Sequence, residues 1–262
     1  MVLLVDMGNT RLNMAGWEEG GPVFSAETPT DRGWNAGSCA AALAKVLAPF
    51  GVVQWDGCAL SSVVPALTDA VRQALFSVTG KEPVVLETSN IGFKVLTKDP
   101  VGADMLAGAE GALARVPMPA IVADLGTATT FCAQNKAGDV LGVAIAPGVA
   151  LSLDALVDRA SHLHAIAFEP PGPAIGTTTA ESMQSGVIYG AACLVDGMFR
   201  RMAAEMDPAE GAPSLILTGG LAPLVAPYCE TKPLLAPDLL LEGLCRCYLR
   251  AKGEDSGWGG QR

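Results

Sequence analysis

A short pattern occurs twice along this chain, at positions separated by almost half its length. In each copy an apolar stretch leads into an aspartate, with a glycine two residues later. The two copies are Val5-Asp6-Met7-Gly8-Asn9-Thr10 and Ala123-Asp124-Leu125-Gly126-Thr127-Ala128. Each has a predicted strand before it and a predicted hairpin after it. One such turn is a frequent strand ending, but two copies 118 positions apart indicate two copies of one fold.

The hydrophobic pattern predicts an α/β chain whose halves meet near the proline-rich stretch 116–119. We predict a first domain over residues 1–117, a second over 118–252, and a disordered polar tail over 253–262. Predicted strands cover about residues 2–5, 12–15, 22–26, 58–62, 83–86, 121–123, 140–145 and 214–218, with a turn at 135–138. Predicted helices cover about residues 37–47, 66–76, 103–115, 148–158, 180–206, 222–226 and 239–250.

Composition narrows the chemistry that the chain can perform. It has 262 residues, 50% of them hydrophobic, which excludes a disordered chain. Its 17 lysines and arginines against 27 acidic residues argue against a broad nucleic-acid-binding surface. The only histidines, His162 and His164, leave little room for histidine-based catalysis, and two ligands do not complete a metal site. We therefore expect both to be surface or interface side chains, and acidic residues to carry the chemistry.

Cysteine usage and hydropathy predict a cytoplasmic protein with no membrane partner. The seven cysteines lack the spacing of a zinc ribbon, so we expect reduced thiols in apolar positions. The longest uncharged run, residues 211–229, contains three prolines and three glycines and is not one lipid-facing helix. The N-terminal apolar run has no basic leader and contains Asp6, which is unlike a signal peptide.

The repeated turns have the composition of a phosphate site. Glycine allows close approach to the backbone, and successive N–H groups can converge on phosphate oxygens. A carboxylate beside such a nest repels phosphate unless a cation lies between them, as in a Mg²⁺-bound nucleotide. A third element, the strand 214–218 leading into Gly219-Gly220, offers a flat surface for a planar base. The alternative for each segment is an ordinary turn, with the aspartate capping the backbone.

The three segments, in this order, resemble the phosphate-1, phosphate-2 and adenosine motifs of the actin, sugar-kinase and chaperone ATPase superfamily; no Walker A motif occurs. Within it, the chain resembles the type III pantothenate kinases from residue 2 to about residue 250. The segments that carry this resemblance are 4–10, 61–65, 101–104, 124–130, 145–148, 152–156, 175–176, Thr179, 183–186, 217–222 and 237–238. The resemblance implies two duplicated RNase H-like (actin-like ATPase) domains with an interdomain nucleotide cleft.

It also implies ATP-dependent phosphorylation of pantothenate to 4'-phosphopantothenate, the first step of coenzyme A biosynthesis. Mg²⁺, a monovalent cation (K⁺ or NH₄⁺) and a homodimer with the substrate site near the subunit interface are implied with it. By position, Asp104 matches the catalytic base, Asp124 the monovalent-cation ligand and Asp6 a Mg²⁺ ligand. The matching ATP-binding residues are Asp6, Met7, Gly8, Asn9, Thr10, Arg11, Leu12, Asn13, Thr127, Gly219 and Gly220. The matching substrate-binding residues are Gly102, Ala103, Asp104, Met105 and Thr179.

The chain departs from the family pattern around the expected substrate site. Met105 stands where the family has arginine, which removes a charge-assisted contact for the carboxylate of pantothenate. The loop 97–100 is about two residues short and lacks the family's glutamate, and Thr177 and His162 stand where relatives carry lysine. These departures keep two alternatives open: a nucleotide-binding accessory or regulatory relative without full activity, and a kinase of another small hydroxylated substrate.

Overall fold

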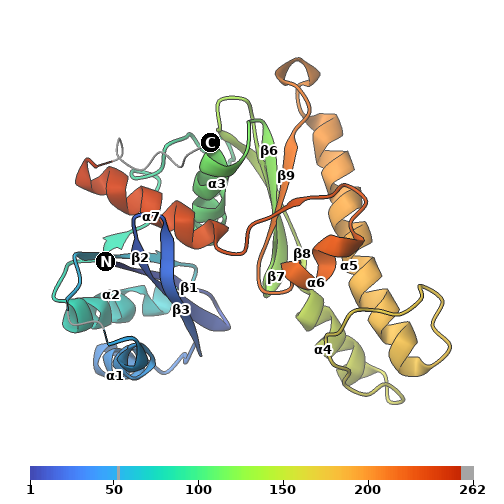
Figure 1. Cartoon of the computed structure of the whole chain (residues 1–262), viewed down its shortest axis with the longest axis horizontal. Helices are drawn as coiled ribbons and strands as arrows, with labels where there is room; N and C mark the ends of the chain where they lie inside the picture. Colours follow the sequence, from blue (N-terminus) through green and yellow to red (C-terminus); the bar gives the residue numbers. More distant parts are fainter. Residues whose placement is uncertain (52–53, 255–262) are drawn as a thin grey trace. The chain divides into compact units, whose positions relative to one another are not determined.

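The computed structural model describes residues 1–51 and 54–254, so residues 255–262 of the predicted tail lie outside the described residues. The chain forms two compact units. Unit 1 comprises Met1–Arg115 and Leu239–Arg262, and unit 2 comprises Val116–Asp238. Figure 1 shows their helices and strands, coloured along the chain.

Unit 1 is built on a five-stranded sheet in the order β3-β2-β1-β4-β5. β1 pairs antiparallel with β2, and β2 with β3, whereas β4 and β5 extend the sheet in parallel. The strands are β1 (Val2–Met7), β2 (Arg11–Glu18), β3 (Gly21–Pro29), β4 (Gly57–Ser62) and β5 (Val84–Val85). The helices are α1 (Ala36–Leu47), α2 (Pro65–Thr79), α3 (Ala103–Arg115) and α7 (Leu239–Lys252), with the 3-10 turn η1 (Ala48–Phe50).

Helices cover both faces of the unit 1 sheet. Alternate residues of β1, including Leu3 and Val5, are fully buried in a core that α1 and α2 complete. α3 and α7 pack on the opposite side of the strands, as Figure 1 shows for α7. Local chemistry sets the helix ends: Asn35 and Ser38 form a capping box for α1, and Pro65 opens α2.

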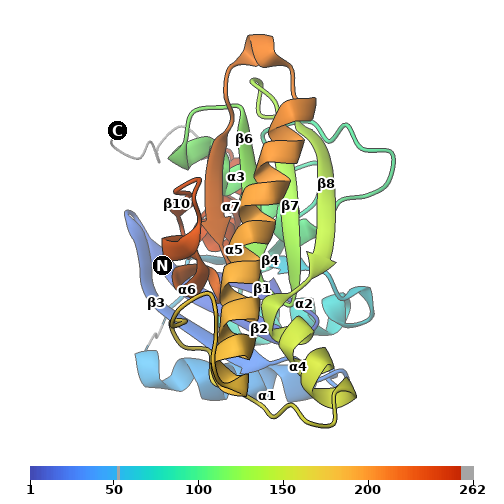
Figure 2. The same ribbon diagram turned by 90° about the vertical axis from the view of Figure 1, so that its right-hand side faces the viewer.

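Unit 2 repeats this design, because its sheet has the order β10-β9-β6-β7-β8 with the same pattern of parallel and antiparallel pairs. The strands are β6 (Ala120–Leu125), β7 (Ala128–Gln134), β8 (Val140–Pro147), β9 (Ser214–Thr218) and β10 (Leu234–Leu235). The helices are α4 (Val149–Arg159), α5 (Thr179–Glu205) and α6 (Ala222–Val225), with η2 (Pro208–Glu210) and η3 (Ala226–Tyr228). Figure 2 shows α5 crossing the sheet, where its residues complete a core around Phe131.

The two sheets correspond strand by strand, which confirms the predicted duplicated α/β fold. The positions of the repeated aspartates also match. Asp6 is the fifth residue of β1 and pairs with Asn13 on β2, and Asp124 is the fifth residue of β6 and pairs with Thr130 on β7. Both strands extend through the aspartate, one residue beyond it, because the hairpin pairing continues there.

The units divide the chain differently from the predicted domains. The break after Arg115 lies two residues before the predicted one, and α7 belongs to unit 1, not to the second domain. The reason is a close helix contact: a Cβ added at Gly243 would lie 1.8 Å from the carbonyl oxygen of Ala107, and one at Gly111 2.3 Å from that of Leu239. Only glycine permits this approach of α7 to α3.

The other predicted elements are present within a few residues of their expected bounds, and Gly138 donates to the carbonyl of Asn135 in the predicted turn. The two-residue strand β10 is not among the predicted strands. All seven cysteines are free thiols and six are buried; burial raises the pKa of Cys132 to about 12. Across residues 1–51 and 54–254, no helix is long and apolar enough to span a membrane.

Candidate functional site

The first repeated turn places a buried carboxylate at the end of the unit 1 sheet. Asp6 is 6% exposed and lies between Asn13 on β2 and Ser61 on β4 in the strand register. Ser61 is fully buried, and its hydroxyl has no hydrogen-bond partner among the described residues. Buried hydroxyls normally have partners. Two oxygen-bearing side chains thus stand side by side at the edge where β1 and β4 end.

Backbone bonds hold the turn that follows in a tight hairpin. The amide of Gly8 donates to the carbonyl of Arg11 at 2.9 Å, and the hydroxyl of Thr30 donates to the carbonyl of Gly8 at 2.8 Å. Asn9 and Thr10 are exposed at its tip. The side chains of Met7 and Leu12, in contrast, lie in the core, so only their backbone groups are available to a ligand.

In the second repeated turn, the aspartate lies close to two glycines, one in the turn itself and one from a distant segment. Asp124 is half-buried, and its Oδ1 would lie 2.3 Å from a Cβ added at Gly219 and 3.4 Å from one at Gly126. Gly219 has a φ of +95°, a conformation that favours glycine. The Asp124 carboxylate therefore lies directly on backbone from the start of the β9–α6 turn. This part of unit 2 brings together three predicted site residues, Asp124, Thr127 and Gly219.

Gly148 supports the same turn from the start of α4. A Cβ at Gly148 would lie 2.2 Å from the carbonyl oxygen of Thr127 and 2.5 Å from that of Gly126. Thr127 itself is exposed. Gly148 thus packs against the backbone of the turn, while the side chain of Thr127 remains accessible to a ligand.

Asp104 lies in the first turn of α3, half-buried at the helix N-terminus. Burial raises the pKa of its carboxyl, although the carboxylate oxygen Oδ1 accepts a hydrogen bond from the amide of Met105 at 2.7 Å. A Cβ at Gly102 would meet Asp104 Oδ1 at 2.6 Å and the Cγ1 of Val63 at 3.6 Å. The amide of Val63 in turn donates to the carbonyl of Met7. This chain of contacts places the Asp104 segment beside the first turn.

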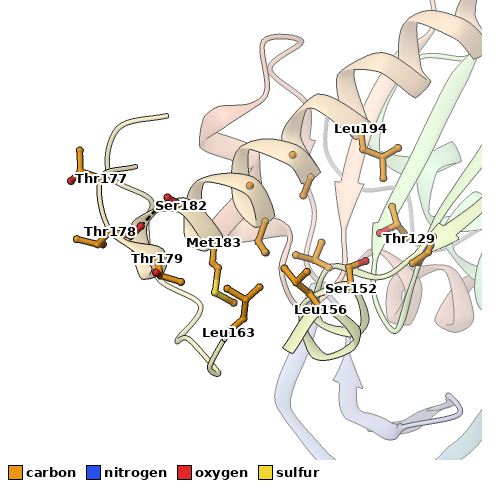
Figure 3. Close-up of a pocket in the computed structure, with 16 residues that line it drawn as sticks. Thr129, Ser152, Leu156, Leu163, Thr177, Thr178, Thr179, Ser182, Met183 and Leu194 are labelled. Atoms are coloured by element: carbon orange, nitrogen blue, oxygen red, sulfur yellow. Dashed lines mark hydrogen bonds between the residues drawn. The ribbon is translucent and has the colours of Figure 1, made fainter. Parts of the chain in front are cut away.

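Unit 2 also contains a cavity of about 930 Å³ between α4, α5 and the start of β7. Figure 3 shows hydroxyls at both ends, from Thr177–Thr179 and Ser182 at one and from Thr129 and Ser152 at the other, with apolar side chains between them. None of the described residues that line it has a charged side chain. Thr179, a predicted substrate contact, is the first residue of α5 and forms part of this wall.

Comparison with known proteins decides the family. A family model described as type III pantothenate kinase matches residues 2–201. The type III pantothenate kinase of Syntrophotalea carbinolica is 36% identical over 258 residues, covering 97% of this chain and 100% of the relative. That of Desulfatibacillum aliphaticivorans is 38% identical, covering 93% and 96%. The chain belongs to the type III pantothenate kinase family.

Solved structures agree on the fold of this type III pantothenate kinase family member. A Campylobacter jejuni protein assigned to the Baf family of transcriptional activators has a TM-score of 0.59 at 17% identity, covering 96% of this chain and 99% of that one. The activator of 2-hydroxyisocaproyl-CoA dehydratase from Clostridium difficile, with bound ADPNP, has a TM-score of 0.56 at 14% identity, covering 100% and 98%. At such identities the likeness concerns the fold alone.

The chemistry of the aspartates fits hard cations. Carboxylate and hydroxyl oxygens at Asp6 and Ser61, and the Asp124 carboxylate between two glycines, are ligands of the kind that Mg²⁺ and K⁺ take. No group of three or more His, Cys, Asp or Glu side chains able to hold a metal occurs in the described part of the chain. A divalent ion here would thus depend on phosphate oxygens and water as well. His162 and His164 are both exposed.

Sequence reasoning gave no role to several residues that shape these sites. Ser61 and Gly148 belong to segments that resemble the family, but only the strand register and the close backbone approach show what they do. Glu110 is fully buried on α3, six residues after Asp104. An acid in the middle of an Ala- and Gly-rich helix was the available signal for it.

Proposed function

We propose that this chain transfers the γ-phosphoryl group of ATP to the primary hydroxyl of pantothenate, yielding 4'-phosphopantothenate for coenzyme A biosynthesis. The observation that carries the proposal is the Asp104 carboxylate, half-buried beside the first turn. Membership of the type III pantothenate kinase family supports the substrate. A carboxylate whose pKa is raised by burial is a better proton acceptor than an exposed one.

In the proposed reaction, Asp104 accepts the proton of the pantothenate hydroxyl as its oxygen bonds to the γ-phosphorus. The bond from that phosphorus to the bridging oxygen breaks, and ADP leaves with the electron pair. Most of the catalysis would come from positioning and charge neutralisation around the transferred group. We assign ATP binding to the first turn from Asp6 to Asn13, to Thr127, and to the Gly219-Gly220 turn.

The same proposal includes two cations. Asp6 would hold Mg²⁺ and Asp124 a monovalent cation, K⁺ or NH₄⁺, and these would neutralise phosphate charge. Backbone amides of the glycine-containing turns supply the remaining donors. This division explains how a chain with a net charge of −10 can bind a nucleotide with few basic side chains.

We further propose a homodimer in which Thr179 contacts substrate near the subunit interface. Five large hydrophobic side chains between residues 145 and 175 are more than a third exposed: Ile145, Leu151, Leu156, Phe168 and Ile175. Large exposed apolar side chains can form part of an interface. Sedimentation velocity should show a dimer at micromolar concentration, and a monomer at all concentrations would contradict this part of the proposal.

The test of the reaction uses the full chain with ATP, Mg²⁺, K⁺ and pantothenate, with phosphopantothenate measured by mass spectrometry. Product should form with pantothenate and not with an analogue that lacks the primary hydroxyl. Nucleotide binding by calorimetry without any turnover would overturn the proposal and favour an accessory role.

A second candidate, a kinase of another small hydroxylated substrate, is favoured by Met105. Its terminal methyl lies 3.4 Å from the position of a Cβ at Gly102, so an apolar group covers the segment where the family has a guanidinium. A panel of alcohols with and without a carboxylate separates the two candidates. Under the first, Met105→Arg should lower the KM for pantothenate; under the second, neutral substrates should have the higher kcat/KM in the unaltered enzyme.

A further inference from the structure

Three acidic side chains of the described residues are less than a tenth exposed: Asp6, Glu110 and Asp196. Asp6 belongs to the first turn, and Asp196 accepts bonds from the backbone amides of Glu230 and Thr231 in unit 2. Glu110, fully buried on α3, has no part in the reaction proposed above. A buried carboxylate costs free energy unless it is paired and hydrogen-bonded, so its partners indicate what it does.

Glu110 joins two arginines of α7 to a loop of unit 1. Its Oε1 accepts from Arg250 Nη2 at 2.9 Å and from Arg246 Nε at 3.3 Å. Its Oε2 accepts from the backbone amide of Gly92 at 2.7 Å. All three partners are donors, two of them charged, which is the arrangement that satisfies a buried carboxylate. Gly92 lies in the connection between β5 and α3.

Arg250 also binds the β5–α3 connection at a second point. Arg250 Nη1 donates to the carbonyl of Asn90 at 3.4 Å. The side chain of Asn90 closes the preceding turn, donating to the carbonyl of Val85 at 2.8 Å and accepting from the amide of Glu87 at 3.0 Å. The segment from the end of β5 to Gly92 is thus fixed by one network that ends on Glu110.

Glycine at position 92 allows the Arg250 guanidinium to approach the backbone closely. A Cβ at Gly92 would lie 2.7 Å from Arg250 Nη2 and 2.9 Å from its Cζ, so the guanidinium lies directly against bare backbone. Ile91 and Phe93, on either side, are buried. Apolar anchors and a charge-assisted bond therefore hold the same three residues.

Other contacts besides this network hold α7 on α3. The glycine contacts at Gly111 and Gly243 already bring the two helices together. Arg115 and Glu242 join them again, through a more exposed pair at 2.5 Å. A buried ion pair is weak evidence of a contribution to stability, because desolvation offsets the attraction. What Glu110 adds beyond helix packing is its bond to the loop.

We propose that Glu110 is a positioning residue for the substrate segment. By holding residues 87–92 against α3, it sets where the following stretch 93–101 begins, and that stretch leads directly into Gly102 and Asp104. The kinetic part of this inference rests on the proposed pantothenate kinase activity. Because Asp104 lies on the packed helix itself, a displaced loop should weaken substrate binding more than the chemical step.

The test uses Glu110→Gln in the full chain. Glutamine has the same shape, but it must turn its NH₂ group toward a donor, because every partner of Glu110 is a donor. We expect the KM for pantothenate to rise about five- to tenfold, with kcat and the KM for ATP within about twofold. By hydrogen exchange, the segment containing Gly92 should exchange about tenfold faster or more.

Other variants separate positioning from simple structural support. Glu242→Gln is the matched control, because it removes an α3–α7 ion pair that does not touch the loop. It should change neither the KM for pantothenate nor the exchange of residues 87–93. Arg250→Gln removes contacts to both Glu110 and Asn90 and should reproduce the KM effect. Arg246→Gln removes the contact to Glu110 without one to Asn90 and should have a smaller effect.

Equal effects of Glu110→Gln and Glu242→Gln on KM and on exchange would overturn the proposal, as would unchanged exchange in Glu110→Gln. Should Glu110→Gln fail to fold, Arg250→Gln supplies the same comparison. If the unaltered protein does not phosphorylate pantothenate, the proposed function fails, and the exchange measurement still decides whether Glu110 positions the loop.

Discussion

The two units of this chain share one sheet topology, but their equivalent parts differ in surroundings. In unit 1 the repeated aspartate, Asp6, is buried beside a serine hydroxyl that has no partner in the described part of the chain, and the hairpin after it ends in an exposed tip. In unit 2 Asp124 is half-buried and lies against the backbone of Gly219, with Gly126 of its own turn on another side. The duplication thus kept the position of the carboxylate and changed what approaches it.

The inserted helices differ in the same way. Between its third and fourth strands, unit 1 has the 12-residue α1, whereas unit 2 has α4 and the 27-residue α5, with a cavity between them. After the fifth strand, α3 carries Asp104 and Glu110, whereas the equivalent α7 carries the arginines that bind Glu110. Asp104, Glu110 and these arginines all belong to unit 1, because α7 packs on α3, whereas the cavity belongs to unit 2.

The largest expected effect concerns Asp104, the proposed base, which unit 1 carries on α3. Asp104→Asn should lower kcat by about 10²- to 10⁴-fold, because the hydroxyl loses its proton acceptor. Burial raises the pKa of Asp104 in the fold, so the charged form opposes folding, and this penalty grows as pH rises through the raised pKa. The variant should therefore melt higher than the unaltered protein at about pH 7, with the difference vanishing below about pH 4. Full activity in the variant would exclude Asp104 as the base.

A pair of glycine substitutions compares the two turns directly. Gly219→Ala combines a φ of +95° with a Cβ 2.3 Å from Asp124 Oδ1, and should cost about 2 kcal/mol or more, with loss of nucleotide binding. Gly8→Ala brings its Cβ 3.1 Å from the Arg11 carbonyl and should cost less than about 1 kcal/mol. Urea unfolding and calorimetry with ATP measure both. Equal losses would mean that the two turns are equally constrained.

The strands, helices and turns of both units are largely predictable from the sequence, because the signals for them are local. These signals are the hydrophobic period, Pro65 at a helix start and the Asp-x-Gly turns. The unit to which α7 belongs is not predictable in this way, because it depends on a contact between Gly111 and Gly243, which are 132 positions apart in the chain. The partners of Glu110 were not predictable either, for the same reason. Asp104 and Thr179 became candidates only through the family resemblance, because an acid or a threonine at a helix start is ordinarily a structural feature.

Two isosteric changes test whether the repeated aspartates hold different cations. Asp124→Asn should weaken the activation of the enzyme by K⁺ about tenfold, a difference of about 1.4 kcal/mol, and leave the Mg²⁺ requirement unchanged. Asp6→Asn should raise the Mg²⁺ concentration that the enzyme requires and leave its activation by K⁺ unchanged. Titrations of initial rate against each cation, with the other held constant, give both values. If each variant shifts both titrations equally, the carboxylates are not divided between the cations.

The smallest expected effect concerns Arg11, an exposed side chain of the first turn that pairs with Glu27. Exposed ion pairs contribute little, so Arg11→Gln and Glu27→Gln should each change stability by less than about 0.5 kcal/mol. If the Arg11 guanidinium also contacts a phosphate of ATP, it contributes to ATP binding, whereas Glu27 does not. We therefore expect Arg11→Gln to raise the KM for ATP about threefold, with no increase in Glu27→Gln. If both variants leave that KM unchanged, Arg11 does not contact ATP, and phosphate binding by the first turn would depend on its backbone amides and the cation at Asp6.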